Sequence, residues 1–272
     1  MRRDTQRLIL LLLPAGIFFA GFFLIPMADL FVIGGSGKEG WAAYAAILTN
    51  ANYFNSLLAT LAVASATTVA TLIISGISGV FLQRHKFPGN AALVAMLTFP
   101  LAFPGVVIGF MVIMLAGRQG LIGQITQAVT GDKVVFAYSM AGLFMGYVYF
   151  SVPRTILTVM AAAEKLDPKL EEAARSLGAS PLRVVRDVII PGLKPAFISA
   201  GAICFATAVG AFGTAFTLAT RINVLPMVIY TEFTLSANIA MAAALSFVLG
   251  AVTWIVLALA RTAAGSTVAA AG

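Results

Sequence analysis

The sequence predicts an all-α, polytopic membrane protein with six transmembrane helices. Hydrophobic residues make up 60% of the 272 residues and charged residues only 10%, whereas soluble domains are about 25% charged. The mean hydropathy is +0.99. The apolar residues occur in long runs, and residues 165–194 hold about a third of the charged residues between two of these runs. This distribution predicts helices in lipid and one polar element outside it.

Six apolar segments are long enough to span a bilayer. A helix needs about 20 residues to cross about 30 Å of hydrocarbon. Backbone groups in lipid must pair within their own segment, which favours helices over open strands, and the alternation of a transmembrane barrel is not seen. The first segment is too long for a cleaved signal peptide, so we expect it to remain as a helix. The predicted spans are residues 8–33, 54–82, 90–116, 134–162, 195–219 and 239–260.

The basic residues predict the orientation of these spans. Four of them fall on one side: Lys38, Arg118, Lys133 and Arg221. Thirteen fall at or near the other: Arg2, Arg3, Arg7, Arg84, Lys86, Arg154, Lys165, Lys169, Arg175, Arg183, Arg186, Lys194 and Arg261. Because basic residues accumulate in cytoplasmic loops, the side with thirteen is predicted to be cytoplasmic. Both termini then lie inside, and the net charge of +7 reflects topology rather than binding to nucleic acid.

The polar segment, residues 165–194, predicts two short helices joined by a tight turn. Asp167 before Pro168 is an N-cap followed by proline at the first helical position, and Gly178 is a left-handed stop. Ser180 with Pro181 repeats the cap, and a second helix is expected over residues 182–189, ending before the next proline.

One face of the first short helix is shallow and apolar. It carries Leu170, Ala173, Ala174 and Leu177, which share a face at helical spacing. Periodicity alone leaves two alternatives open, because this face can pack beneath its own bundle or receive another protein.

The same segment resembles the EAA loop of permease subunits in binding-protein-dependent ABC importers. The family pattern is EAA, three residues, Gly, nine residues, then I-x-L-P. This chain has Glu172, Ala173 and Ala174, then Gly178, and ends with Val188, Ile190 and Pro191 at the same spacing. Val188 and Ile190 are mild apolar departures from the pattern. The resemblance covers a core of about residues 54–261 of a single permease domain over residues 1–272, with the coupling loop at about 163–194.

The resemblance implies how the chain would work. In that family the loop is a coupling helix that docks on a cytoplasmic ATPase dimer. Its contact residues here would be Leu170, Glu172, Ala173, Ala174, Leu177, Gly178 and Pro191. ATP and Mg²⁺ would bind to that partner, because this chain lacks a P-loop, and no cofactor, metal site or catalytic residue is expected in the chain itself. The other expected partners are a second, homologous but different permease chain, a periplasmic or surface binding protein and membrane lipid, with the complex in the bacterial inner membrane.

Prolines and small residues mark candidate pathway segments. Pro100 and Pro104 in the third span each remove a backbone hydrogen bond and are expected to bend the helix. The fifth span carries the small residues Gly210, Gly213, Thr214 and Thr217, and Phe212 lies among them as a further pathway candidate. Small residues at such spacing permit close helix contact, and the alternative is a gate or partner interface. The family resemblance implies that spans three to five line the pathway.

Two acids near the predicted outer edge bear on the substrate. Asp29 and Glu232 can reach interfacial water, but a carboxylate in the membrane usually has a function. Two alternatives stay open: both acids reach interfacial water, or Glu232 faces the outer vestibule and attracts a cationic substrate. The resemblance extends to the polyamine, iron(III), sulfate and aminoethylphosphonate branch, so polyamine-like cargo such as spermidine or putrescine is expected, with aminoethylphosphonate, iron(III) or another small solute as alternatives.

A secondary transporter is the alternative class of function. It requires internal repeats and charged groups for ion coupling at mid-span, and neither is evident in the sequence.

Overall fold

The computed structural model describes residues 2–218 and 222–264, and the side chains of 10–218 and 222–262. Within these ranges every regular element is helical, which confirms the predicted fold class. Six helical stretches are long and apolar enough to cross a membrane: Leu10–Gly35, Ala51–Arg84, Gly105–Thr130, Met140–Lys165, Pro181–Val209 and Ile239–Thr262. Arg221 and the predicted end of span five at residue 219 lie outside the described residues.

The chain divides into two compact units. The first comprises Met1–Leu57 and Leu225–Val252, and the second Leu58–Val224 and Thr253–Gly272. The elements of the first unit are α1 (Arg2–Phe19), the π-helix η1 (Ala20–Leu24), α2 (Ile25–Gly35), the 3-10 helix η2 (Gly40–Ala42), α3 (Ala43–Thr49), the start of α4 (Ala51–Arg84), α13 (Leu225–Thr234) and the first half of α14 (Ile239–Ala264).

Aromatic rings hold the loop after α2 against the helices of the first unit. The Phe31 ring lies 5.2 Å from the rings of Trp41 and Tyr44 and 4.9 Å from that of Phe247, centroid to centroid. The Tyr44 hydroxyl also donates to the backbone carbonyl of Phe31. Burial raises the pKa of the Tyr44 hydroxyl, so this donor keeps its proton at physiological pH.

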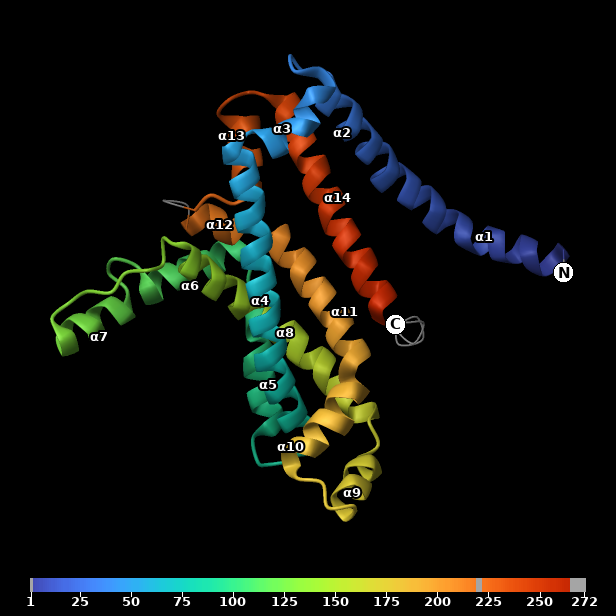
Figure 1. The fold of residues 1–272 in the computed structure, drawn as a ribbon, viewed down its shortest axis with the longest axis vertical. Helices are drawn as coiled ribbons and strands as arrows, with labels where there is room; N and C mark the ends of the chain where they lie inside the picture. The colour runs from blue at the N-terminus through green and yellow to red at the C-terminus, as the bar shows by residue number, and fades with distance from the viewer. Residues whose placement is uncertain (1, 219–221, 265–272) are drawn as a thin grey trace. The chain divides into compact units, whose positions relative to one another are not determined.

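The second unit contains the rest of the bundle, and Figure 1 shows α9 and α10 beyond the ends of α8 and α11. Its elements are most of α4, α5 (Asn90–Thr98), the 3-10 helix η3 (Phe99–Ala102), α6 (Gly105–Ala116), α7 (Leu121–Thr130), α8 (Met140–Lys165), α9 (Pro168–Ser176), α10 (Pro181–Val184), the π-helix η4 (Val185–Ile189), α11 (Ile190–Val209), α12 (Gly213–Leu218) and the end of α14.

A small apolar core joins α4, α8 and α11. Val159 and Ala163 of α8 and Leu193 of α11 are almost completely buried, and Val80 of α4 and Phe197 of α11 pack against them. The backbone of α4 approaches closely here, since a Cβ added at Gly79 would lie 3.0 Å from the side chain of Val159. This core lies next to the ends of α8 and α11 that carry the polar loop.

The third span is interrupted, which corrects the prediction of one bent helix over residues 90–116. α5 and η3 end at Ala102, Phe103 and Pro104 have extended backbone, and α6 begins at Gly105. Pro104 removes one backbone donor and disfavours the helical conformation of Phe103. The long apolar stretch in this region is Gly105–Thr130, while Asn90–Ala102 forms a shorter apolar helix.

The fourth and fifth spans also differ from their predicted limits. α8 starts at Met140 rather than residue 134, because the irregular segment before it is bonded to the end of α6, where the Phe136 and Ala137 N–H groups both donate to Ala116 O at 3.1 Å. The fifth span breaks after Val209 and resumes as α12 at Gly213.

The close contact between α6 and α12 generates a stability prediction. A Cβ added at Gly109 would lie 2.6 Å from the Thr217 Cβ, whereas Gly16 has nothing within 4 Å. We expect Gly109→Ala to lower the stability by about 1–3 kcal/mol, because α6 and α12 must move apart. Gly16→Ala should be neutral or slightly stabilising. The thermal unfolding midpoint in detergent, followed by circular dichroism, measures both changes, and equal midpoints would contradict the packing.

Candidate functional site: the α9–α10 loop and the α8–α11 cavity

The first short helix of the polar loop begins and ends as its residues predict. Asp167 Oδ1 accepts a hydrogen bond from the Lys169 N–H at 2.9 Å, with Pro168 at the first helical position. At the other end Gly178 has a φ of +81°. The Gly178 N–H donates to Arg175 O at 2.9 Å and the Ala179 N–H to Ala174 O at 3.0 Å. This pair of bonds is a Schellman motif, which fixes a sharp turn after α9.

The second helix does not stop before Pro191, which corrects that part of the prediction. Ser180 Oγ accepts from the Arg183 N–H at 3.4 Å, and α10 then continues through η4 directly into α11. Within η4 the Ile190 N–H donates to Val185 O, five residues back. A π turn leaves a carbonyl without its usual donor, so the N–H that Pro191 lacks is tolerated next to it. The loop is therefore continuous with the fifth span.

The apolar side chains of the loop are exposed in this chain. Leu170 is 52% exposed, Leu177 89% and Leu182 78%. Glu172 and Ala173 are also exposed, and Ala174 is half-buried. Of the two alternatives left open by the sequence, the chain's own bundle does not cover this face. An exposed apolar patch rimmed by charges is typical of a protein-binding surface.

Arg84, at the end of α4, ties the loop to the bundle. Its Nη2 lies 2.6 Å from Glu171 Oε1, and both side chains are less than a fifth exposed. The same Nη2 donates to the Leu166 carbonyl at 3.1 Å. The start of α11 also packs against Leu166, since a Cβ added at Gly192 would lie 2.6 Å from Leu166 Cδ1. The start of α9, the end of α4 and the start of α11 are thus held together.

Sequence reasoning missed this contact. It counted Arg84 only among the cytoplasmic charges and gave Glu171 no partner. The two residues are far apart in the chain, and neither lies in a motif that indicates pairing, so no signal in the sequence could have joined them.

The interruptions of the third and fifth spans lie against each other. Thr214 Oγ1 donates to Gly105 O at 2.9 Å, and a Cβ at Gly213 would lie 3.0 Å from Val106 N. The Tyr147 hydroxyl, on α8, donates to Ala211 O at 2.6 Å. Of the predicted pathway residues, Gly213 and Thr214 therefore lie against Gly105 and Val106, the two residues that follow Pro104.

The other predicted pathway residues lie in different surroundings. Pro100 is buried, Gly210 is exposed at the end of α11, and Phe212 is half-buried with its ring 5.2 Å from that of Phe216. In the first unit, Glu232 is half-buried and its Oε1 accepts from the Tyr53 hydroxyl at 3.0 Å, while Asp29 is exposed.

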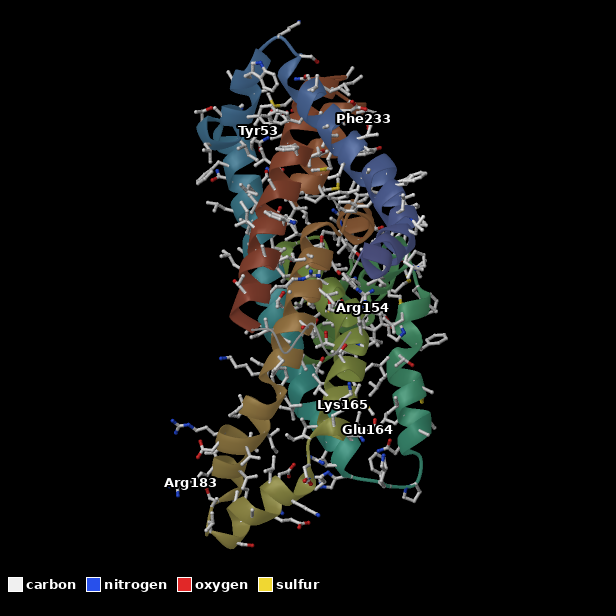
Figure 2. All side chains as sticks on the ribbon, turned by 90° about the vertical axis from the view of Figure 1, so that its right-hand side faces the viewer. Tyr53, Arg154, Glu164, Lys165, Arg183 and Phe233 are labelled. Carbon is white, nitrogen blue, oxygen red and sulfur yellow. The ribbon has the colours of Figure 1, made fainter. Side chains whose placement is uncertain are left out.

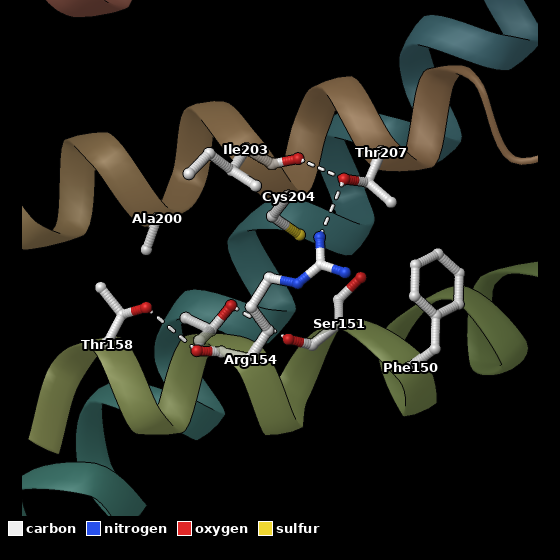
Figure 3. Close-up of a pocket in the computed structure, with 9 residues that line it drawn as sticks. Phe150, Ser151, Arg154, Thr158, Ala200, Ile203, Cys204 and Thr207 are labelled. Carbon is white, nitrogen blue, oxygen red and sulfur yellow. Dashed lines mark hydrogen bonds between the residues drawn. The ribbon is translucent and has the colours of Figure 1, made fainter. Parts of the chain in front are cut away.

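A cavity between α8 and α11 contains a cation that the sequence-based orientation placed near the cytoplasmic side. Arg154 lies 11 residues before Lys165 in α8, or about 16 Å at 1.5 Å per residue. Figure 2 shows Arg154 well separated from Lys165 and Arg183. The guanidinium donates from Nη1 to Thr207 Oγ1 at 3.4 Å, and both residues line the cavity (Figure 3).

Comparison with known proteins gives the family. Residues 73–264 match the family described as binding-protein-dependent transport system inner membrane component. The chain belongs to this family. It is therefore an ABC importer permease subunit, a multi-pass inner-membrane protein and not an enzyme, since ATP hydrolysis resides in a separate subunit. The alternative of a secondary transporter is set aside.

Relatives in the family are named for different solutes. The chain is 29% identical over 206 residues to the sulfate transport system permease protein CysT of Salmonella typhimurium, covering 76% of this chain and 73% of that protein. It is 26% identical over 251 residues to the putative 2-aminoethylphosphonate transport system permease protein PhnU of the same organism, covering 90% and 88%. It is 34% identical over 154 residues to the molybdenum transport system permease protein ModB of Escherichia coli, covering 55% and 66%.

Solved structures share the fold at low sequence identity. A chain of a bacterial alginate ABC transporter, in complex with an alginate pentasaccharide-bound periplasmic protein, matches with a TM-score of 0.81 at 16% identity, covering 98% of both chains. A chain of the MetNI methionine ABC transporter matches with a TM-score of 0.55 at 18% identity, covering 80% of this chain and 95% of that one.

The contact between Arg84 and Glu171 predicts how the loop responds to mutation. We expect Arg84→Gln to loosen the start of α9, because the Glu171 carboxylate, only 12% exposed, loses the cation that it is paired with. Tryptic cleavage at the exposed Lys169 and Arg175 should become several-fold faster.

The matched control is Arg186→Gln, since Arg186 lies 3.9 Å from Asp187 and is 85% exposed and such pairs contribute little. The double variant Arg84→Gln/Glu171→Gln should recover part of the resistance, because no buried charge remains unpaired. Equal cleavage rates in Arg84→Gln and wild type would refute the anchoring role.

Proposed function

We propose that this chain forms half of the substrate pathway of an ATP-driven importer and that the α9–α10 loop couples it to a cytoplasmic ATPase dimer. The observation that carries the proposal is the exposed apolar face of α9, with Leu177 89% exposed, at the position of the EAA pattern. Glu172, Ala173, Ala174 and Gly178 contact the ATPase, with Leu170, Leu177 and Pro191 at the edges of the interface. ATP and Mg²⁺ bind to the ATPase.

Two connections would transmit a movement of the loop to the membrane-spanning helices. α10, η4 and α11 are continuous, so a displacement of the loop moves the fifth span directly. The Arg84–Glu171 contact transmits the same displacement to α4. When ATP closes the ATPase dimer, the two permease chains rock between inward-open and outward-open states.

The remaining partners follow from the proposed role. A second permease, homologous but different in sequence, supplies the other half of the pathway. A binding protein delivers the solute at the side opposite the loop, which is supported by the similar alginate transporter, whose structure is a complex with a periplasmic protein. Both termini lie in the cytoplasm, in agreement with the distribution of basic residues.

Two classes of solute are candidates for the cargo. Polyamine-like cargo is favoured by Glu232, a half-buried carboxylate that faces the solute in this hypothesis, although its Oε1 already accepts from Tyr53. Small anionic cargo, with aminoethylphosphonate first, is favoured by the names of the relatives. We place the anion ahead of the polyamine.

Retention of the ATPase tests the coupling role. We expect Gly178→Asp to reduce the amount of ATPase that copurifies with the permease by about tenfold or more, because the turn is central to a docking surface. The matched control is Gly131→Asp, since Gly131 has a φ of +82° against +81° for Gly178 and both have open space around them.

The two variants therefore carry the same backbone strain. Equal loss of ATPase in both would attribute the effect to strain alone and would contradict docking at the α9–α10 turn. Normal retention in Gly178→Asp would do the same.

Glu232 provides the test of the polyamine candidate. If the carboxylate attracts a cation, Glu232→Gln should slow uptake of labelled spermidine by several-fold at low ionic strength, and added salt should narrow the difference. Tyr53→Phe, which removes the hydrogen-bond donor but keeps the charge, is the control and should leave uptake close to wild type. Unchanged spermidine uptake in Glu232→Gln would end this hypothesis.

A further inference from the structure

Arg154 is a charged side chain far from either end of a membrane-spanning helix. It lies about 21 Å from the first residue of α8 and about 16 Å from the last, at 1.5 Å per residue over Met140–Lys165. A charge at such a depth is costly unless it faces a partner or a watery cavity, and it usually marks the path of an ion or substrate. The side chain is exposed in this chain, so the bundle itself does not enclose it.

The surroundings of Arg154 do not neutralise its charge. The cavity is lined by Phe150, Ser151, Arg154, Thr155, Thr158, Ala200, Ile203, Cys204 and Thr207, and this set contains no carboxylate. Within the part of the chain that the structure describes, no ion pair to Arg154 is found. A guanidinium has five N–H donors, and the bond to Thr207 Oγ1 at 3.4 Å occupies one of them.

One hydroxyl beside the guanidinium also lacks a partner. Thr155, Thr158 and Thr207 each donate to a backbone carbonyl one turn earlier in their own helix. Ser151 is only 5% exposed. Its Oγ is nevertheless without a hydrogen-bond partner. Figure 3 shows Ser151 beside the guanidinium. Buried hydroxyls are normally satisfied, so an unpartnered one next to a cation points to an acceptor from outside the chain.

We propose that Arg154 and Ser151 form an anion subsite in the translocation pathway and that the cargo carries a small oxyanion group, such as a sulfate, phosphonate or molybdate. This inference rests on the proposed permease role. The guanidinium donates a charge-assisted pair of hydrogen bonds to two oxygens, and Ser151 donates to a third. Thr207 holds the guanidinium in place.

The charge of the site disfavours a polyamine at this point of the pathway, and the volume of the cavity fits a small oxyanion. The cavity volume is about 60 Å³, which is room for about four waters at roughly 15 Å³ each. That is comparable with a central atom and its four oxygens. A polycation would also meet Arg154 with charge of the same sign.

Uptake by the complete importer tests the subsite. The permeases, ATPase and binding protein are reconstituted in proteoliposomes, and uptake of labelled sulfate, molybdate, 2-aminoethylphosphonate and spermidine is measured. We expect at least one of the three anions to be taken up. Arg154→Gln should reduce that uptake by about tenfold or more, Ser151→Ala should reduce it several-fold, and Arg154→Lys should restore part of the loss because it keeps the charge.

Two control variants remove a positive charge and a hydroxyl group at positions outside the cavity. Arg118→Gln removes an exposed charge outside the cavity, and Ser246→Ala removes a hydroxyl bonded to Ala242 O of its own helix. Both should transport at the wild-type rate. Uptake of spermidine alone, or of none of the three anions, would overturn the proposal, and so would anion uptake that Arg154→Gln leaves unchanged.

ATPase retention separates the two levels of inference. If Arg154→Gln keeps the ATPase and its hydrolysis but loses uptake, the subsite and the permease role both stand. If wild-type protein retains no ATPase, the permease role fails. If the complex of Arg154→Gln falls apart, Arg154 instead pairs with a carboxylate of the second permease, and the anion subsite is refuted.

Cys204 gives a readout that does not depend on the cargo. It is the single cysteine of the chain and lines the same cavity. In the complex with cysteine-free partners, a negatively charged methanethiosulfonate should modify Cys204 faster than a positively charged one, and Arg154→Gln should abolish that preference. Absence of modification by both reagents in every nucleotide state, or a preference unaffected by Arg154→Gln, would contradict an anion-attracting pathway at this position.

Discussion

Backbone groups inside a bilayer must find partners within the protein, and the second unit is organised by this requirement. Two of its spans are interrupted at Phe103–Pro104 and at Gly210–Phe212. The interruptions persist because neighbouring side chains take up the freed carbonyls: Thr214 donates to Gly105 O and Tyr147 to Ala211 O. Glycine at 105, 109 and 213 lets the backbones approach closely enough for these bonds. Irregular backbone at membrane depth is tolerated only when it is buried in this way or lines a cavity.

The same requirement explains why the fifth span reaches into the polar loop. A helix that stopped before Pro191 would leave several carbonyls unsatisfied near the membrane surface. The π turn of η4 instead carries the helix past the proline with the Ile190 N–H bonded to Val185 O. As a result, α10, η4 and α11 form one continuous helical stretch. Arg84 adds a second contact, from the start of α9 to the end of α4, so the proposed coupling would act on two spans.

Features set by neighbouring residues could be predicted from the sequence, and features set by distant ones could not. The caps at Asp167 and Ser180 and the stop at Gly178 depend on a few adjacent residues, and all three were predicted correctly. Hydropathy located the six spans, but Pro104 was expected to bend the third rather than interrupt it. The Arg84–Glu171 contact and the orphaned hydroxyl of Ser151 depend on how α4, α8 and α11 pack, which no local pattern encodes.

The position of Arg154 shows why counting charges is insufficient. An arginine contributes equally to the positive-inside balance whether it reaches the surface or not, and the count therefore assigned Arg154 to the cytoplasmic side. Its position far from both ends of α8 indicates a function other than orientation. A guanidinium that were needed only for orientation would be accommodated at lower cost near Lys165, at the end of the helix. Retaining it beside an unpartnered hydroxyl, with no carboxylate among the cavity residues, is explained when a negative charge enters the cavity from outside the chain.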